Sequence, residues 1–253
     1  MGITGAITTH LDIAQLVLYM FWIFFAGLIY YLVRENHREG YPMETEGNRV
    51  RTSGWPIPSP KTYKLAHGGE FSVPNDRVSP QKLAAEPAHR WAGAPLVPTG
   101  NPMLDGVGPG AWADRADVPD MTYTGAPKIV PLRTMADYSV SKADTDPRGL
   151  PMVGADGVVA GTVVDLWVDI AEDLFRYLEV EINGSGRHVL VPMNFARIKR
   201  HQVKVGAILG GQFAAVPGTR HTEIITLLEE EKIMAYYGAG TLYATPSRAE
   251  PLL

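Results

Sequence analysis

The chain has 253 residues, a formal net charge of −4 at pH 7 and no cysteine. The missing cysteine excludes disulfides, thiolate metal sites, iron–sulfur clusters and cysteine nucleophiles, and the charge balance provides no basic footprint for nucleic acid. The hydrophobic content of 45% and charged content of 20% are ordinary for a globular chain.

The first element is an apolar segment, IAQLVLYMFWIFFAGLIYYLV at residues 13–33, which has no charged side chain. About 21 residues with a rise of roughly 1.5 Å each span roughly 31 Å, the thickness of the hydrocarbon core of a bilayer. A signal peptide is the alternative, but residues 1–12 have no Lys or Arg and the segment ends in bulky residues. We therefore predict residues 1–11 as an N-terminal segment and residues 12–34 as a retained transmembrane helix.

The flanks of this segment predict its orientation. Arg34 and Arg38 follow it and Asp12 precedes it, so the positive-inside rule places the N-terminus outside and the bulk of the chain in the cytoplasm. Tyr30, Arg34 and Arg38 lie at the predicted membrane boundary and are candidates for contact with lipid headgroups.

A Pro-rich segment follows over residues 35–145. It contains 14 of the 20 prolines between Pro42 and Pro131, which oppose helices and central strands. A disordered linker is the alternative, but such linkers are usually poor in aromatic residues, and this one contains Trp55, Tyr63, Phe71, Trp91 and Trp112. We expect extended chain laid over a partner's surface, with one hairpin around the sequence YKLAHGGEFSV.

Residues 146–245 have the pattern of a small, closed or nearly closed β-barrel, followed by a tail at 246–253. Short alternating segments are separated by turn signals such as Asp156-Gly157 and Asn183-Gly184. The segment KVGAILGGQFAAVP is expected to form a strand or a short turn of helix. Thr226 and Glu229 have the spacing of a capping box, which predicts a helix that ends at Gly238.

One set of titratable residues surrounds the turn between two predicted strands: Asp169, Glu172, Asp173 and Arg176, with Asp165 upstream. Carboxylates held close together raise one another's pKa, titrate as a group and can pass protons near neutral pH. A solvated polar loop is the alternative.

A second acidic set, Glu229, Glu230 and Glu231, opens the predicted helix. An acidic first turn favoured by the helix dipole is the simpler interpretation. The seven histidines show no metal-ligand spacing, and the chain has neither an HExxH motif nor a nucleophile elbow.

Long segments in the same order resemble the H subunit of the purple-bacterial photosynthetic reaction centre. They are GLIYYLVRENHREGYP, PTGNPMLDGVGPGAW, DPRGLP, VVDLWVD with RYLEVE, and LLEEEKIMAYYGAGTLYATP. The barrel alone resembles the PRC-barrel, a module that also occurs in soluble proteins. The resemblance implies one N-terminal transmembrane helix and a mainly β cytoplasmic domain of PRC-barrel type, with a Pro-rich extended segment and a short C-terminal helix.

The resemblance also implies a function. An H subunit caps the cytoplasmic face of the two pigment-binding subunits, L and M, stabilises the site of the secondary quinone and conducts protons to it. It is a structural and proton-conducting subunit, not an enzyme, and it binds no cofactor alone. Bacteriochlorophyll, bacteriopheophytin, quinones and non-haem iron are expected in the partner subunits. Light-harvesting antenna subunits, a cytochrome subunit and membrane lipids are further candidate partners, and the expected location is the bacterial inner (intracytoplasmic) membrane with a periplasmic N-terminus.

Residue roles are implied in the same way. Asp169, Glu172 and Arg176 match positions close to the secondary quinone, with Asp173 less directly supported, and Glu229 or Glu230 matches a carboxylate of the same proton network.

One departure concerns the surface entry of protons. Some relatives have paired histidines before the KI(x)P element, whereas this chain reads DVPDMTYTGAPKIVP. We therefore expect a carboxylate entrance at Asp117 and Asp120.

Two other functions remain open at this stage. A membrane-tethered PRC-barrel adaptor in a non-photosynthetic assembly would explain the anchor and the barrel but not the Pro-rich segments. A membrane-anchored enzyme has only the acidic cluster in its favour, without an evident nucleophile, metal set or phosphate loop.

Overall fold

The computed structural model describes residues 6–8, 11–41, 43–44, 51–52, 57–66, 68–75, 83–91 and 94–249. The chain divides into two compact units, and each is described by itself. The first consists of Met1–Gln81 and His89–Pro95, and the second of Lys82–Ala88 and Leu96–Leu253. Trp55, in the predicted Pro-rich segment, lies outside the described residues.

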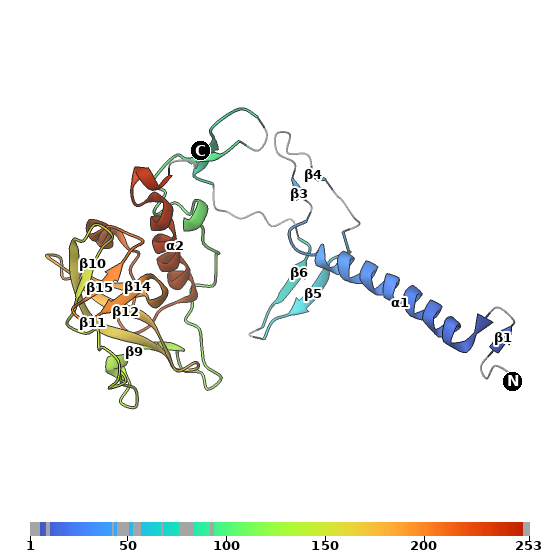
Figure 1. Ribbon diagram of the computed structural model, residues 1–253, viewed down its shortest axis with the longest axis horizontal. Helices are drawn as coiled ribbons and strands as arrows, with labels where there is room; N and C mark the ends of the chain where they lie inside the picture. The colour runs from blue at the N-terminus through green and yellow to red at the C-terminus, as the bar shows by residue number, and fades with distance from the viewer. Residues whose placement is uncertain are drawn as a thin grey trace. The chain divides into compact units, whose positions relative to one another are not determined.

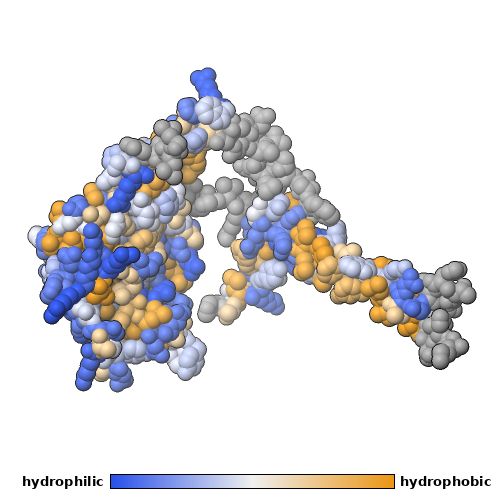
Figure 2. Space-filling view, in the orientation of Figure 1, coloured by the Kyte–Doolittle hydropathy of each residue, from blue (hydrophilic) through white to orange (hydrophobic). Residues whose placement is uncertain are grey.

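The first unit is built on the helix α1, Ile13–Asn36, which follows the short antiparallel strands β1, Ala6–Thr8, and β2, Leu11–Asp12. The side chain of Asp12 caps α1 by accepting a hydrogen bond from the Gln15 amide at 2.6 Å. None of the side chains of α1 is buried, and its most apolar stretch has a mean hydropathy of 2.2. Figure 2 shows that the side chains along this helix are mainly apolar, as expected of a helix that lipid can surround. The predicted membrane helix is confirmed as an element of the fold.

Two hairpins follow α1 in the first unit. Strands β3, Met43–Glu44, and β4, Arg51–Thr52, form one, and β5, Lys61–Lys64, and β6, Glu70–Val73, form the other. The second is the hairpin expected from the sequence, with Tyr63 opposite Phe71.

The second unit contains a seven-stranded sheet (Figure 1). Its strands run in the order β13-β12-β11-β10-β15-β14, and β9 pairs with β11. The bounds are β9, Ile129–Pro131; β10, Pro151–Val153; β11, Val159–Asp169; β12, Leu174–Ile182; β13, His188–Pro192; β14, Ala196–Lys199; and β15, Gln202–Val205. The strands β13 and β14 end this path and are joined through a short 3-10 helix, η3, at Met193–Phe195. This is the mainly β, barrel-like domain that the sequence predicts.

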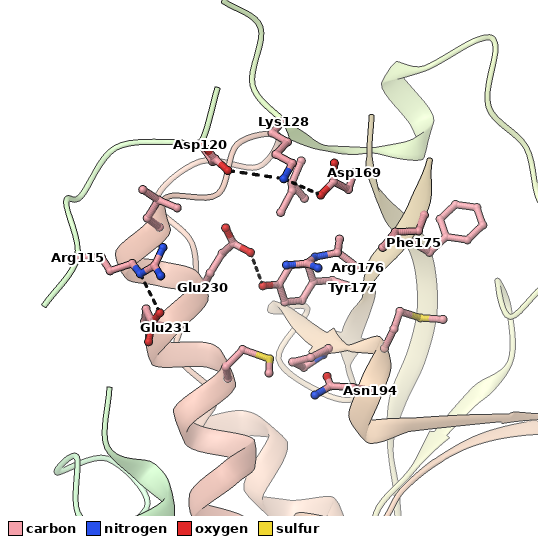
Figure 3. Close-up of a pocket in the computed structure, with 16 residues that line it drawn as sticks. Arg115, Asp120, Lys128, Asp169, Phe175, Arg176, Tyr177, Asn194, Glu230 and Glu231 are labelled. Atoms are coloured by element: carbon pink, nitrogen blue, oxygen red, sulfur yellow. Dashed lines mark hydrogen bonds and ion pairs between the residues drawn. The ribbon is translucent and has the colours of Figure 1, made fainter. Parts of the chain in front are cut away.

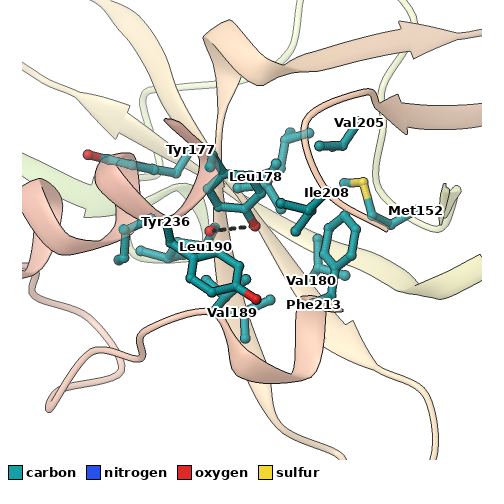
Figure 4. Packing of buried hydrophobic residues seen from close by; sticks show 14 of the residues in the cluster. Met152, Tyr177, Leu178, Val180, Val189, Leu190, Val205, Ile208, Phe213 and Tyr236 are labelled. Carbon is teal, nitrogen blue, oxygen red and sulfur yellow. Dashed lines mark hydrogen bonds between the residues drawn. The ribbon is translucent and has the colours of Figure 1, made fainter. Parts of the chain in front are cut away.

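Both faces of the two longest strands are buried. Leu166, Trp167 and Val168 are each 1% exposed, although they alternate in direction along β11. A register shift between Val163 and Asp165 and another between Trp167 and Val168 interrupt the simple alternation. Figure 4 shows part of the resulting core, in which Leu178 and Val180 of β12 pack with Ile208 and Phe213.

The helix α2, Leu227–Tyr243, completes this core (Figure 1). Thr226 caps it, and Thr226 and Glu229 form the predicted capping box. The helix does not end at Gly238, so that prediction was wrong. A Cβ atom at Gly238 would lie 2.5 Å from the carbonyl oxygen of Pro109, so this glycine allows close packing within a continuing helix.

The latter part of the Pro-rich segment belongs to the barrel unit. It contributes the hairpin β7–β8, Ala85–Pro87 and Leu96–Pro98, and the 3-10 helix η1, Gly108–Gly110, as well as β9. Met103 and Leu132 join the barrel core. From Leu96 onward the chain is therefore one compact unit, which begins well before residue 146.

Three further 3-10 helices connect or end these elements: η2, Leu132–Thr134; η4, Gly210–Ala215; and η5, Pro246–Ala249. The segment KVGAILGGQFAAVP therefore contains part of a strand, β15, and a 3-10 helix, η4.

Candidate functional site

The turn after β11 is organised by Asp169. Its Oδ1 atom accepts hydrogen bonds from the amides of Ala171 at 3.0 Å and Glu172 at 3.2 Å, while its side chain is 1% exposed. Asp173 follows in the left-handed backbone region with φ 54°, which Asp tolerates better than most residues. The turn thereby brings together the carboxylates that the sequence places around it.

Lys128 partly offsets the negative charge of this acidic turn. Its Nζ atom lies 3.2 Å from Glu172 Oε1, 3.5 Å from Asp169 Oδ2 and 3.9 Å from Asp120 Oδ2. The hydrogen bond to Glu172 raises the pKa of Lys128 and outweighs the opposing effect of burial, so the ammonium group stays charged. The acidic cluster therefore has its own cation.

Lys128 was not predicted from the sequence, because the strand pairing that places it is not local. Strand β9 pairs with β11 so that Ile129 lies opposite Asp169. Its one local signal is its position directly before an apolar strand.

Glu230 of α2 and Tyr177 of β12 meet across a groove (Figure 3). The Tyr177 hydroxyl donates to Glu230 Oε2 at 2.7 Å. Burial raises the pKa of Glu230, although Tyr177 and the charge of Arg176 act in the opposite direction. Burial also raises the pKa of Tyr177 far above its ordinary value, so its hydroxyl remains a donor. Glu230 consequently keeps its proton to a higher pH than an ordinary glutamate does.

The groove has a volume of about 690 Å³ and is walled by the strand ends of the barrel and the first turns of α2. Figure 3 shows Lys128 between Asp120 and Asp169 on one side, and Arg115 paired with Glu231 on the other. The polar or charged residues that line it are Arg115, Asp120, Lys128, Asp169, Arg176, Tyr177, Asn194, Glu230 and Glu231. Glu172 does not line the groove, but it pairs with Lys128, which does, and its side chain is 50% exposed.

Three of the predicted site residues are engaged elsewhere. Glu229 is 7% exposed and accepts hydrogen bonds from the amides of Thr226 at 2.9 Å and Arg220 at 2.8 Å. Asp117 is bound by the Arg220 guanidinium and by the Thr226 hydroxyl. Asp173 accepts a hydrogen bond at 2.6 Å from the Tyr138 hydroxyl. None of the three lines the groove.

Of the headgroup candidates, Arg38 is held by protein groups. Its Nη1 atom donates to the carbonyls of Ser59 at 2.8 Å and Val73 at 3.1 Å, and Glu35 accepts from the rest of the guanidinium. The side chain is 8% exposed, so Arg38 attaches the β5–β6 hairpin to the end of α1. Headgroup contact by Tyr30 and Arg34 stays a prediction.

A second polar cluster, buried in the barrel, was not predicted. Asp165 and Glu179 lie directly opposite each other on β11 and β12, and such a pair of like charges requires a cation. Arg133 supplies it, with Nη1 3.0 Å from Asp165 and 2.6 Å from Glu179.

Glu179 has two further partners, Trp167 Nε1 at 2.9 Å and His188 Nδ1 at 2.6 Å. Burial alone would raise the pKa of Glu179, but the hydrogen bonds from His188, Arg133 and Trp167 together lower it. This cluster is satisfied within the fold and acts as a structural support.

Within the described residues, no group of three or more His, Asp or Glu side chains has the arrangement of a metal site. The groove offers carboxylates, a phenol and cations, which are groups that can bind and release protons.

Two comparisons with known families agree with this architecture. The family model for the photosynthetic reaction centre, H-chain N-terminal region, matches residues 5–134, just over half of the chain. The model for the PRC-barrel domain matches residues 140–209, from before β10 to beyond β15. The first match covers α1 and most of the Pro-rich segment. The anchor would also fit a non-photosynthetic adaptor, but the Pro-rich segment would not. The chain therefore belongs to the family of photosynthetic reaction centre H chains and is a single-pass, membrane-anchored H subunit that carries a PRC-barrel domain.

Proposed function

We propose that this H subunit caps the cytoplasmic face of the pigment-binding subunits L and M and that its groove conducts protons to the secondary quinone. Full reduction of that quinone takes up two electrons and two protons. A protein cap over the quinone must therefore supply proton carriers, because a purely apolar cover would block proton uptake. The observation that carries the proposal is the half-buried Glu230, whose pKa is raised and which accepts a hydrogen bond from Tyr177.

The neighbouring groups support a relay. Asp120 at the rim, the Asp169–Glu172 turn and Glu230 share one groove or its edge. Lys128 contacts the carboxylates of Asp120, Asp169 and Glu172 and reduces the repulsion among them. We propose Asp120 as the entrance in place of histidines, and we assign Asp117 a structural role because Arg220 and Thr226 occupy it. Arg176 lines the groove and favours the ionised form of Glu230, so it tunes the affinity of that carboxylate for a proton.

The remaining features of the assembly follow from this assignment. We propose that the N-terminus is periplasmic and that the barrel is cytoplasmic, in agreement with Arg34 and Arg38 after α1. The chain itself would catalyse no reaction and bind no pigment. The partner subunits would hold bacteriochlorophyll, bacteriopheophytin, quinones and non-haem iron, and antenna and cytochrome subunits would complete the complex.

Capture of the tagged full chain from gently solubilised native membranes tests the assembly. We expect two hydrophobic subunits to accompany it, with near-infrared bacteriochlorophyll bands that bleach in light. A colourless eluate from pigmented membranes would contradict the proposed capping role.

The substitution Glu172→Gln tests the proton route. Without the Glu172 carboxylate, proton-coupled second electron transfer to the quinone should slow, whereas primary charge separation should be unchanged. Glu181→Gln is the matched control, because Glu181 is an exposed carboxylate on β12 that does not line the groove. Unchanged second-transfer kinetics in Glu172→Gln would remove this residue from the route.

A further inference from the structure

The chain carries its charge unevenly, and one segment has no acid at all. Residues 183–222 contain six Lys or Arg residues and no Asp or Glu, although the whole chain has more acids than bases. Two of the six cations have partners within the protein. Arg187 donates to the carbonyls of Ala214 and Val216, and Arg220 pairs with Asp117. The other four lie on a single hairpin.

This basic hairpin consists of β14, β15 and the turn between them, and its cations are Arg197, Lys199, Arg200 and Lys204. None of the four makes an ion pair or a side-chain hydrogen bond with another group in the described part of the chain. Arg197 and Lys204 are direct cross-strand partners, an arrangement of like charges that costs stability. Arg197, Lys199 and Arg200 are exposed.

The hairpin also forms one wall of a groove of about 420 Å³. Arg197, Lys199 and Lys204 line it together with Asn194, Phe195 and Gly206. An edge strand such as β14 often carries lysine to prevent pairing with another chain. That role does not require an Arg opposite a Lys, two further cations and an acid-free surrounding segment. The uncompensated charge is better explained by an anionic partner.

Two features favour a lipid surface over an acidic protein. Protein interfaces are usually centred on buried aromatic anchors and are depleted in lysine. Here Phe195, the aromatic residue of the groove, is packed against the core and stacks on Tyr237 at 5.7 Å, so it is not available as an anchor. The domain is moreover tethered covalently to a bilayer through α1.

We propose that the basic hairpin docks the barrel domain on the headgroups of anionic phospholipids. Each Lys or Arg near an anionic membrane surface contributes about 1 kcal/mol of attraction, so loss of one cation should lower the ratio of docked to undocked domain about five-fold. This inference depends on the membrane anchor and not on the proton route. Its test is therefore independent of the kinetics of Glu172→Gln.

The absence of cysteine provides a specific probe position. The exposed residue His201 lies in the turn of the hairpin, and His201→Cys would give the full chain a unique site for a fluorescent donor. The labelled chain is reconstituted into nanodiscs that contain headgroup-labelled acceptor lipid, in either phosphatidylcholine alone or a mixture with phosphatidylglycerol. We expect energy transfer to increase with phosphatidylglycerol and to decrease in about 1 M salt, where the screening length is only about 3 Å.

Matched variants identify the responsible charges. Lys199→Gln should reduce docking about five-fold, and Lys199→Arg should retain it. Lys142→Gln should have no effect, because Lys142 is also an exposed lysine of the barrel unit without an ion pair among the described residues. Equal energy transfer in both lipid mixtures, or an equal loss in Lys142→Gln, would overturn the proposal. If anionic lipid has no effect on docking but loss of the hairpin charges still prevents assembly, the hairpin binds an acidic protein partner and the lipid proposal is wrong.

Discussion

Glu229 and Glu230 are adjacent in the chain but have different environments. Glu229 points to the start of α2, where its two oxygens accept hydrogen bonds from backbone amides. Glu230 faces the groove and shares a hydrogen bond with Tyr177. On a helix, neighbouring side chains point about 100° apart, so only one of the two can face a given site. The capping-box spacing could have assigned Glu229 a structural role from the sequence alone.

Substitution of Glu229 should therefore change stability and leave electron transfer unchanged. Glu229→Ala leaves the buried amide of Thr226 and the partly buried amide of Arg220 without acceptors, and it should lower the free energy of unfolding by about 1–2 kcal/mol. Glu229→Gln should retain most of that stability, because glutamine also serves in a capping box. Denaturant unfolding of the full chain in detergent measures both, with the exposed Glu223→Ala as the control. Slow second electron transfer in a stable Glu229→Gln variant would contradict this assignment.

Only some of the residues of the site could be predicted from the sequence, and Lys128 shows why. The turn residues Asp169, Glu172 and Asp173 are local in sequence, and their proximity could be predicted. Lys128 and Glu230 reach the same region through the pairing of β9 with β11 and the packing of α2. Neither the strand pairing nor the helix packing can be read from residues that are close together in the sequence. The same applies to Arg133, whose two carboxylate partners lie on other strands.

The glycines of α2 show how the packing of neighbouring elements decides where a helix ends. A glycine in a helical pattern normally indicates its end, and the sequence could not reveal that η1 would pack against this position. The Cβ of an alanine at Gly238 would meet the Pro109 carbonyl oxygen at 2.5 Å, and one at Gly240 would meet Ile208 at 2.4 Å. Gly238 thus allows the close contact between α2 and the GVGPG motif, whereas Gly240 makes room for Ile208.

Gly238→Ala should therefore destabilise the domain although alanine favours helix. The gain in helix propensity is about 1 kcal/mol, whereas overpacking against a backbone oxygen costs roughly 1–3 kcal/mol. We expect a net decrease in the denaturant midpoint of the full chain. Gly211→Ala, where no atom lies within 4 Å of the added Cβ, is the control and should be close to neutral. A variant at Gly238 that is about 1 kcal/mol more stable would show that η1 does not pack as described.

The end of α1 and the β5–β6 hairpin form another pair of coupled elements. Both could be predicted as separate elements from apolar length and from alternation. Their attachment through Arg38 could not, because it depends on two backbone carbonyls, those of Ser59 and Val73.

Arg38→Gln should loosen this attachment. Loss of charged hydrogen bonds worth about 1.5 kcal/mol or more should accelerate amide exchange in residues 61–64 and 70–73 by about ten-fold or more. Hydrogen exchange of the full chain in detergent measures the effect. Arg34→Gln is the control, since the side chain of Arg34 makes no hydrogen bond or ion pair in the described residues. Equal exchange rates in the two variants would remove Arg38 as the link.

At the scale of the whole molecule, the fold class was predictable because hydrophobic length and turn spacing are long-range patterns. The transmembrane helix, the barrel and the helix that completes it are all present. The extent of the barrel unit was not predictable, because Pro-rich sequence has no period that would show Met103 and Leu132 entering its core. The groove arises where this segment, the barrel and α2 come together.

The most direct test of the proposed proton route is the rate of second electron transfer in Glu230→Gln complexes, measured at increasing pH from the ordinary carboxyl value of 4.5 upward. Burial raises the pKa of Glu230 above the ordinary 4.5. Its protonated fraction therefore falls as the pH rises through that raised value, and the wild-type rate should fall with it. Second electron transfer in Glu230→Gln should be slower by about ten-fold. The loss should be smaller than that for a sole general acid, because Asp169 and Glu172 remain. The variant should also lack the decline of the rate with rising pH. A Glu230→Gln complex with the wild-type rate and pH profile would contradict the account.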